Sequence, residues 1–204
     1  MTEDNICIHC KQAFKSTRND ANFCSSKCRQ AAYRVRSEEK EARTLFTIGY
    51  EGIRLPDFIK VLKANKIKHL LDVRESTKSG QKSEFSEYIL SHTFKNGGIT
   101  YHSNKSLGDP ENIKKPYLTN KILTPEFEIQ YREHLAGIDM KELACEIKQF
   151  GRTALLCYEK FAIGNKMVLK GKGKDKKKFK INCHRGILAN VLKETGEFDE
   201  IIHL

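Results

Sequence analysis

The chain of 204 residues has no long apolar run, and its acidic residues are outnumbered by basic ones. No stretch approaches the roughly 18 consecutive apolar residues of a membrane-spanning helix, so we expect no membrane segment and no membrane partner. The first ten residues, MTEDNICIHC, are polar and acidic, unlike a secretory signal peptide. We therefore expect a cytoplasmic protein, whose seven cysteines bind metal or lie buried rather than form disulfides.

The shortage of acidic side chains leaves 37 Lys and Arg against 26 Asp and Glu, a formal net charge of +11. This excess favours an anionic partner, and we expect nucleic acid, with DNA favoured over RNA. Hydrophobic residues make up 39% and charged residues 31%, as in a globular chain. The length allows one ordinary core and a small appendage.

Four cysteines form two close pairs near the N-terminus, C-x2-C and C-x3-C, separated by thirteen residues. They are Cys7, Cys10, Cys24 and Cys28. Four thiolates in this pattern are typical of a closed, structural Zn(II) site, and the polar segment between them is too poor in core residues to fold without metal. We expect a zinc ribbon and a basic helix over residues 1–40.

The stretch FCSSKCRQAAYRVR is similar to zinc ribbons of the type FCS-x-x-CR followed by a basic helix. We expect Ser25 or Ser26 to cap this helix. The resemblance implies a role in nucleic-acid or protein docking. The alternative is a solvated linker helix, because SEEKEAR restores the charge balance.

Residues 44–204 alternate short apolar runs with amphipathic stretches, which predicts a mostly parallel sheet covered by helices on both faces. The expected strands are 45–50, 68–74, 99–103, 153–159 and 198–204. The expected helices are 56–65, 83–98, 126–137, 139–151 and 185–196, with a loop holding SLGDP and KKPY. In such sheets, ligands bind at the carboxyl ends of the strands.

Titratable and aromatic residues stand at these strand ends. They are Tyr50, Asp72, Arg74, Tyr101 and Glu159, followed by Cys183, His184 and Arg185 at the start of the last helix. Several such residues converging on one crevice is the arrangement of a functional site. Cys145 and Cys157 we expect to be core residues.

Five motifs in order, TIGYEG, LLDVRES, SLGDP, LLCYE and CHRGILA, resemble the domain-of-unknown-function family 488 over about residues 45–204. The resemblance implies a Rossmann-like α/β domain and a link to nucleic-acid modification or to removal of modified bases. The chain departs from the family pattern in one place, because residues 160–182 separate CYE from CHR where a short turn is usual.

This insertion is rich in lysine: residues 166–180 hold eight lysines and one acid. Gly171 and Gly173 permit a turn, so we expect a two-stranded ribbon or a mobile loop. We predict that it binds the phosphate backbone of nucleic acid through Lys172, Lys174, Lys176, Lys177 and Lys178. The alternatives are a solvated loop or a targeting-like basic run.

The Cys-His-Arg sequence favours anion binding over cysteine catalysis. Arg185 follows Cys183 after one residue, which leaves no phosphatase-like cradle of backbone N–H groups, so a buried, inert Cys183 is the favoured interpretation. At a helix start, His184 and Arg185 can grip phosphate, and His184 can also shuttle a proton. Alternatively, Arg185 pairs with Asp72 or Glu159.

We expect Asp72, Glu159 and His184 to be catalytic in a DNA glycosylase-like hydrolase. One carboxylate would stabilise positive charge on the sugar and the other would activate water, while Tyr50 or Tyr101 stacks on a flipped base. Two alternatives stay open. One is a non-catalytic nucleic-acid sensor or adaptor, and the other is a metal-dependent nuclease with Asp72 and Glu159 on Mg²⁺.

Overall fold

The computed structural model describes residues 3–18, 20–78, 82–95, 97–118, 125–160, 167–170, 177–180 and 183–204. The chain divides into two compact units, Met1–Glu41 and Ala42–Leu204. Among the helices of the described residues, none has the length and hydropathy needed to cross a bilayer.

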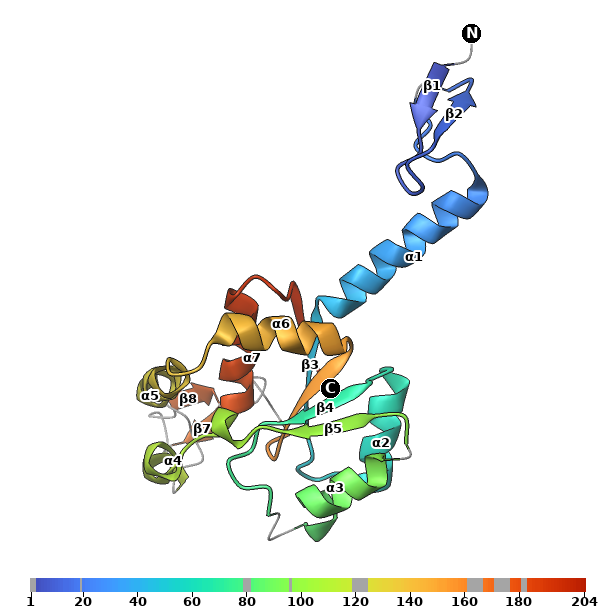
Figure 1. Ribbon diagram of the computed structural model, residues 1–204. Helices are drawn as coiled ribbons and strands as arrows, with labels where there is room; N and C mark the ends of the chain where they lie inside the picture. Colours follow the sequence, from blue (N-terminus) through green and yellow to red (C-terminus); the bar gives the residue numbers. More distant parts are fainter. Residues whose placement is uncertain are drawn as a thin grey trace. The chain divides into compact units, whose positions relative to one another are not determined.

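The first unit is a small hairpin followed by a long helix (Figure 1). Strand β1 (Glu3–Ile6) pairs antiparallel with β2 (Ala13–Ser16), and α1 spans Ser26–Ala42. The Ser25 hydroxyl accepts the backbone N–H of Cys28 at 3.2 Å, which confirms the expected cap. Ile6 and Ile8 are 69% and 54% exposed, so the hairpin has little hydrophobic core to stabilise it.

The second unit is built on one parallel sheet, as predicted. Its strands are β3 (Thr44–Gly49), β4 (His69–Asp72), β5 (Thr100–Ser103), β6 (Thr153–Cys157) and β9 (Glu200–His203). Their order is β5-β4-β6-β3-β9, and each pairing is parallel. The α/β class inferred from the alternating pattern is therefore confirmed.

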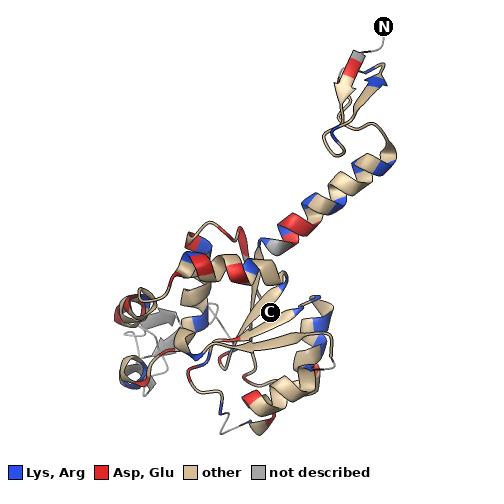
Figure 2. Ribbon diagram, in the orientation of Figure 1, with Lys and Arg blue, Asp and Glu red and all other residues tan. Residues whose placement is uncertain are grey.

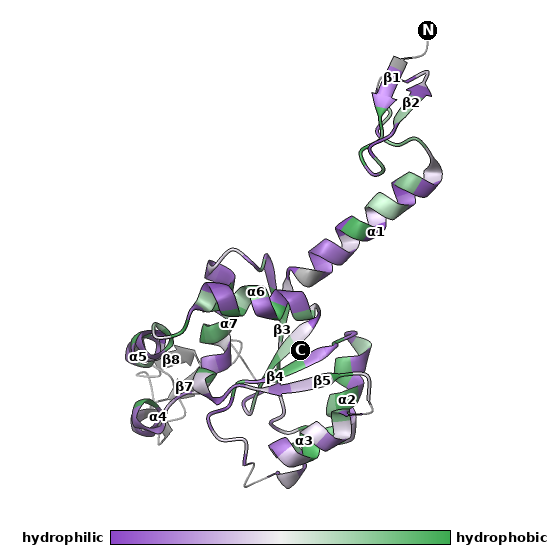
Figure 3. Cartoon of the chain, in the orientation of Figure 1, coloured by the Kyte–Doolittle hydropathy of each residue, from purple (hydrophilic) through white to green (hydrophobic). Residues whose placement is uncertain are grey.

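Helices cover both faces of this sheet (Figure 3). Neighbouring residues of β4 and of β6 belong to hydrophobic clusters on opposite faces. On one face, α2 (Leu55–Ala64) and α3 (Glu87–Phe94) pack on a core that includes Leu70 and Leu156. On the other, α5 (Pro125–Leu135), α6 (Met140–Phe150) and α7 (His184–Glu194) pack on Leu71 and Leu155. A step of one residue along β4 or β6 thus moves a side chain to the opposite face.

Three segments differ from the expected elements. The helix expected over 83–98 is broken at Ser86, whose extended backbone separates a single 3₁₀ turn, η1 (Ser83–Phe85), from α3. A short turn, η2 (Lys105–Leu107), follows β5. The expected loop around KKPY instead contains α4 (Glu111–Leu118), which begins where the Pro110 carbonyl accepts the amides of Ile113 and Lys114.

The two described segments of the lysine-rich insertion pair as strands, as in the expected two-stranded ribbon. Strand β7 (Met167–Lys170) pairs antiparallel with β8 (Lys177–Lys180). Lys172, Lys174 and Lys176 lie outside the described residues, and the side chains of Lys177 and Lys178 are not described either. Their predicted contact with phosphate stays a prediction.

Candidate functional site

The four N-terminal cysteines form the first candidate site. Their sulfur atoms all lie within 4.8 Å of one another. The sulfur of Cys24 is 3.7 Å from that of Cys10 and 3.4 Å from that of Cys28. Hydrogen bonds from the backbone N–H groups of Cys10 and Cys24 lower the pKa of Cys7 to about 6, which favours its thiolate. This donor set can hold one tetrahedral metal ion.

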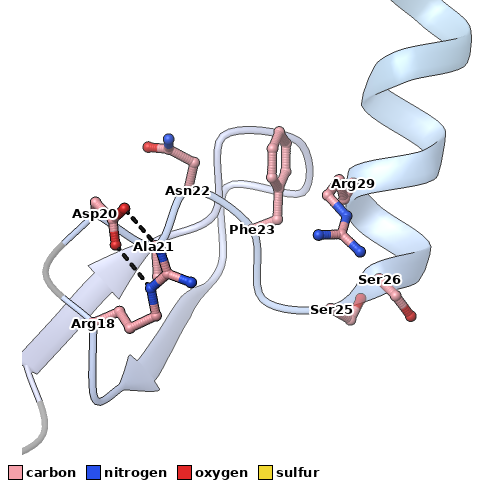
Figure 4. A pocket seen from close by; sticks show the side chains of 8 residues that line it. All are labelled: Arg18, Asp20, Ala21, Asn22, Phe23, Ser25, Ser26 and Arg29. Atoms are coloured by element: carbon pink, nitrogen blue, oxygen red, sulfur yellow. Dashed lines mark hydrogen bonds and ion pairs between the residues drawn. The ribbon is translucent and has the colours of Figure 1, made fainter.

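A polar pocket of about 400 Å³ adjoins the start of α1 in the same unit (Figure 4). Arg18 forms an ion pair with Asp20 at 3.0 Å on one side, while Arg29 extends from the first turn of α1. Phe23 lies between them. Basic side chains recur along α1, mixed with acidic ones (Figure 2). The helix thus has both the charge for docking and the mixed surface of a solvated linker.

The second candidate site lies at the carboxyl ends of the strands, where β6 ends and α7 begins. Four donor atoms, from Cys157, Glu159, Cys183 and His184, all lie within 4.8 Å of one another. We call these residues the strand-end cluster. Glu159 Oε2 accepts a hydrogen bond from each thiol at 3.0 Å. The two cysteines and His184 are buried, and Glu159 is partly exposed.

His184 is held from two sides. Its Nε2 lies 2.9 Å from the Val73 carbonyl, which can only accept, so Nε2 carries a proton. Its Nδ1 lies 3.2 Å from Asp109 Oδ1. Burial alone would lower the pKa of His184, but the charges of Cys157 and Asp109 raise it to about 10. The neighbouring charges therefore favour the imidazolium form of His184.

The positive charge of His184 lowers the pKa of two neighbouring groups, Glu159 and Cys157. Burial would raise the pKa of Glu159, but the His184 charge and the thiol hydrogen bonds lower it to about 2. Burial would likewise raise the pKa of Cys157, yet the hydrogen bond from Cys183 and the imidazolium lower it to about 7. The pKa of Cys183 is raised by burial and by Cys157. The cluster therefore couples an ionised carboxylate, an imidazolium and a thiol that is easily deprotonated.

Asp109 is a site residue that was not singled out from the sequence, although it belongs to the SLGDP motif. It is 5% exposed and forms an ion pair with Lys114 at 3.4 Å. Gly108 places it, because a Cβ there would lie 2.2 Å from the backbone nitrogen of Glu75. The only signal in the sequence was the motif itself, since the approach of this loop to β4 is a long-range contact.

The Arg185 side chain, from the first turn of α7, binds backbone carbonyl groups at the ends of two strands. Its NH1 donates to the carbonyl oxygens of Ile48 at 2.7 Å and Glu159 at 3.0 Å, and the side chain is 1% exposed. A Cβ at Gly49 would lie 1.8 Å from the Glu159 carbonyl oxygen, so glycine is needed for this approach. Arg185 thus joins β3 to the end of β6, and it neither faces solvent nor pairs with the Asp72 or Glu159 carboxylates.

Asp72 lies on the opposite face of the sheet from the strand-end cluster. It is fully buried in an ion pair with Arg74, and the Tyr101 hydroxyl donates to it at 2.6 Å. Arg74 also donates to the Tyr50 hydroxyl at 2.6 Å, and Phe85 stacks on the Tyr50 ring. Asp72 lies on the same face of the sheet as Leu70, whereas Glu159 lies on the same face as Leu155. The structure therefore does not bring the two expected catalytic carboxylates together.

The residues predicted to share one crevice therefore form two separate groups. His184, Glu159 and Cys183 converge, whereas Asp72, Arg74, Tyr50 and Tyr101 form a separate hydrogen-bonded network. Tyr50 is 3% exposed, so its ring packs in the core and is not open to a base. A Mg²⁺ ion shared by Asp72 and Glu159 has no support in this arrangement. The catalytic and substrate-binding roles of these residues stay predictions.

Comparison with protein families gives one match, to "Domain of unknown function DUF488", over residues 54–170. The chain belongs to this family. The match covers more than half of the chain, and the DUF488 region includes Asp109, Cys157 and Glu159 of the site just described. Comparisons with curated proteins and with solved structures find no match.

Proposed function

We propose that this DUF488 protein is a hydrolase that acts on nucleic acid, with DNA as the first substrate to test. The observation that carries the proposal is the position of His184 beside two carboxylates, Asp109 at 3.2 Å and Glu159, at the carboxyl ends of a parallel sheet. Support for a polyanionic substrate comes from the net charge of +11 and from the lysine-rich ribbon, which ends three residues before Cys183.

The proposed reaction is hydrolysis of the bond between base and sugar. Breaking this bond builds positive charge on the sugar, and an ionised carboxylate stabilises such a charge. Glu159 fits this role, because it is ionised and is the partly exposed member of the cluster. His184 is the acid that protonates the departing base, and Asp109 orients its ring. Water then adds to the sugar carbon in place of the base and gives a proton back to His184. A base must leave the stack to reach this position.

The N-terminal metal ion is proposed to be Zn²⁺. Four thiolates close its coordination shell, so the role of this ion is structural and not catalytic. The unit it stabilises presents Arg29 and the basic positions of α1, and we propose that this surface adds to nucleic-acid binding.

The activity is tested with a panel of DNA oligonucleotides that carry normal and modified bases, scored for abasic sites by alkaline cleavage. We expect the wild type to release at least one base, and Glu159→Gln to be about 10²–10⁴ times slower, the range for a lost acid–base group. Glu200→Gln, at an exposed position of β9, is the matched control and should keep full activity.

Absence of base release from every DNA and RNA substrate would refute the hydrolase. Tight binding without release, unaffected by Glu159→Gln, would instead identify the protein as a non-catalytic nucleic-acid adaptor.

A further inference from the structure

We propose that the strand-end cluster binds a second metal ion, Zn²⁺, through Cys157, Cys183 and His184, with Glu159 completing the tetrahedral shell. The inference concerns metal binding alone and does not rest on the proposed hydrolysis. The hydrolysis uses His184 and Glu159 without a metal ion, so the two proposals are alternative roles for these residues. It assigns a function to Cys157 and Cys183, which a C-x-E and C-H spacing does not reveal in the sequence.

The donor types are those that zinc selects. Thiolate, imidazole and carboxylate are all established zinc ligands, and soft thiolates favour Zn²⁺ over Mg²⁺ or Ca²⁺. Cys157 and Glu159 are two residues apart along an extended chain and therefore face the same side, toward α7. The first residues of α7 bring Cys183 and His184 to the same point.

The separations fit one ion. Zinc–sulfur bonds near 2.3 Å with zinc–nitrogen or zinc–oxygen bonds near 2.1 Å place tetrahedral ligand atoms about 3.6 Å apart. His184 Nδ1 is 3.8 Å from the Cys157 sulfur and 4.0 Å from the Cys183 sulfur. Glu159 Oε2 is 3.0 Å from each sulfur, the length of the thiol hydrogen bonds that metal–sulfur bonds would replace.

His184 is oriented as a zinc-binding histidine is. Such residues usually donate the N–H of the non-coordinating nitrogen to a carbonyl or carboxylate, which fixes the ring. The Val73 carbonyl accepts from Nε2 at 2.9 Å, so Nδ1 is the nitrogen left for an ion. Nδ1 lies 3.2 Å from Asp109 Oδ1 and 3.8 and 4.0 Å from the sulfurs of Cys157 and Cys183. An ion would take the place of the Asp109 contact, and Asp109 would keep its ion pair with Lys114. On binding, the ion displaces the Nδ1 proton and the thiol protons, which pass to solvent.

The charge balance also favours a metal ion. Two thiolates, one carboxylate and Zn²⁺ sum to −1, and the buried Arg185 guanidinium beside Cys183 offsets this charge. Burying such a group of polar side chains without a metal is costly compared with an apolar core. Since Glu159 is partly exposed while the other ligands are buried, it is the ligand that water or a substrate can displace.

The test is the metal content of the purified full-length chain, measured by elemental mass spectrometry. We expect two zinc ions per wild-type chain. Cys157→Ser and Cys183→Ser should each contain one, as should Cys7→Ser/Cys10→Ser, and the combined Cys7→Ser/Cys10→Ser/Cys183→Ser chain should contain none. Cys145→Ser is the matched control, because Cys145 lies on α6 outside both clusters, and it should keep two.

Cobalt separates the two sites by spectroscopy. In the Cys7→Ser/Cys10→Ser chain, stripped of metal, added Co²⁺ should give the intense visible bands of tetrahedral thiolate coordination, and His184→Gln should abolish them. Circular dichroism shows whether each variant is folded, and His184→Gln replaces any serine variant that is not.

One zinc per wild-type chain, lost entirely in Cys7→Ser/Cys10→Ser, would overturn the proposal. So would a disulfide between Cys157 and Cys183 in the chain purified without reductant, with no second metal after reduction. Two zinc ions without base release would support this site while refuting the hydrolase, and base release by a chain with one zinc ion would do the reverse.

Discussion

Alternation along β6 decides which side chains form the strand-end cluster. Leu155, Cys157 and Glu159 face α7, whereas Leu156 and Tyr158 face α2 and α3. The same rule on β4 sends Val73 toward α7 and Asp72 away from it. A carboxylate one residue earlier or later in the sequence would therefore belong to a different site, with different chemistry.

Asp72 is consequently expected to stabilise the fold rather than to react. In Asp72→Asn the Arg74 guanidinium, 5% exposed, loses its charged partner, and an unpaired buried charge costs about 3–5 kcal/mol. The free energy of unfolding, measured in urea, should fall by that amount. Asp57→Asn is the control, because the Asp57–Lys60 pair is 47% and 78% exposed and such a solvent-screened pair adds little to stability.

An Asp72→Asn chain with unchanged stability and lost base release would contradict this structural role. That result would restore the catalytic role that its position at a strand end first suggested.

At the scale of elements, a pair of histidines joins β4 to β5. His69 Nδ1 lies 3.0 Å from His102 Nε2, and Phe150 of α6 stacks on both rings. Burial lowers the pKa of both histidines, and the His102 charge lowers that of His69 further. The folded chain thus holds both rings neutral at a pH where the unfolded chain protonates them.

This pair makes stability depend on pH. Below the unfolded pKa of about 6.5, the unfolded chain binds more protons than the folded one, so stability falls as the pH drops through this window. Between pH 7.5 and pH 5, we expect the urea midpoint of the wild type to fall relative to that of His69→Gln/His102→Gln. His92→Gln, at an exposed position of α3, should decline as the wild type does. Equal declines in all three chains would contradict the assignment.

The elements that could be predicted are those with local signals. Apolar runs located β3, β4 and β6, and Ser25 located the start of α1. Local signals predicted a loop around KKPY, because proline usually ends a helix. Pro116 nevertheless lies inside α4. The hairpin β1–β2 was missed because it carries no strong strand pattern.

The two candidate sites also differ in whether a local sequence signal predicts them. Cysteine spacing alone predicted the N-terminal cluster, since knuckle geometry is local. The strand-end cluster depends on strand order and on which face each residue takes, which the sequence does not state. Glu159 and His184 were recognised as polar residues at strand ends, while Cys157 was assigned to the core because it ends an apolar run.

The whole molecule combines two units that are stabilised differently. The second unit has two hydrophobic clusters around its sheet, whereas Cys7 is the buried apolar side chain among the described residues of the first. A metal ion held by the four cysteines would therefore supply much of the stability of Met1–Glu41. The DUF488 match ends at residue 170, the last residue of β7, so most of the lysine run lies beyond the family region.

That run supplies a large part of the positive charge of the molecule. We therefore expect it to determine how steeply the affinity for DNA falls with salt concentration. We expect replacement by alanine of Lys172, Lys174, Lys176, Lys177 and Lys178 to weaken binding to DNA of any sequence. For each phosphate that the variant no longer neutralises, the plot of log affinity against log salt concentration should become less steep by about 0.9. Fluorescence anisotropy with labelled duplexes, from low to physiological salt, measures this slope.

The matched control removes the same charge from exposed positions elsewhere, through Lys63, Lys68, Lys95, Lys115 and Lys193. If the ribbon binds phosphate, only the ribbon variant shows a shallower slope, because counterion release depends on the phosphates neutralised and not on net charge. An equal change in both variants would mean that the net charge attracts DNA without a defined binding surface. An unchanged slope in the ribbon variant would remove the ribbon from nucleic-acid binding and leave α1 as the basic element to test.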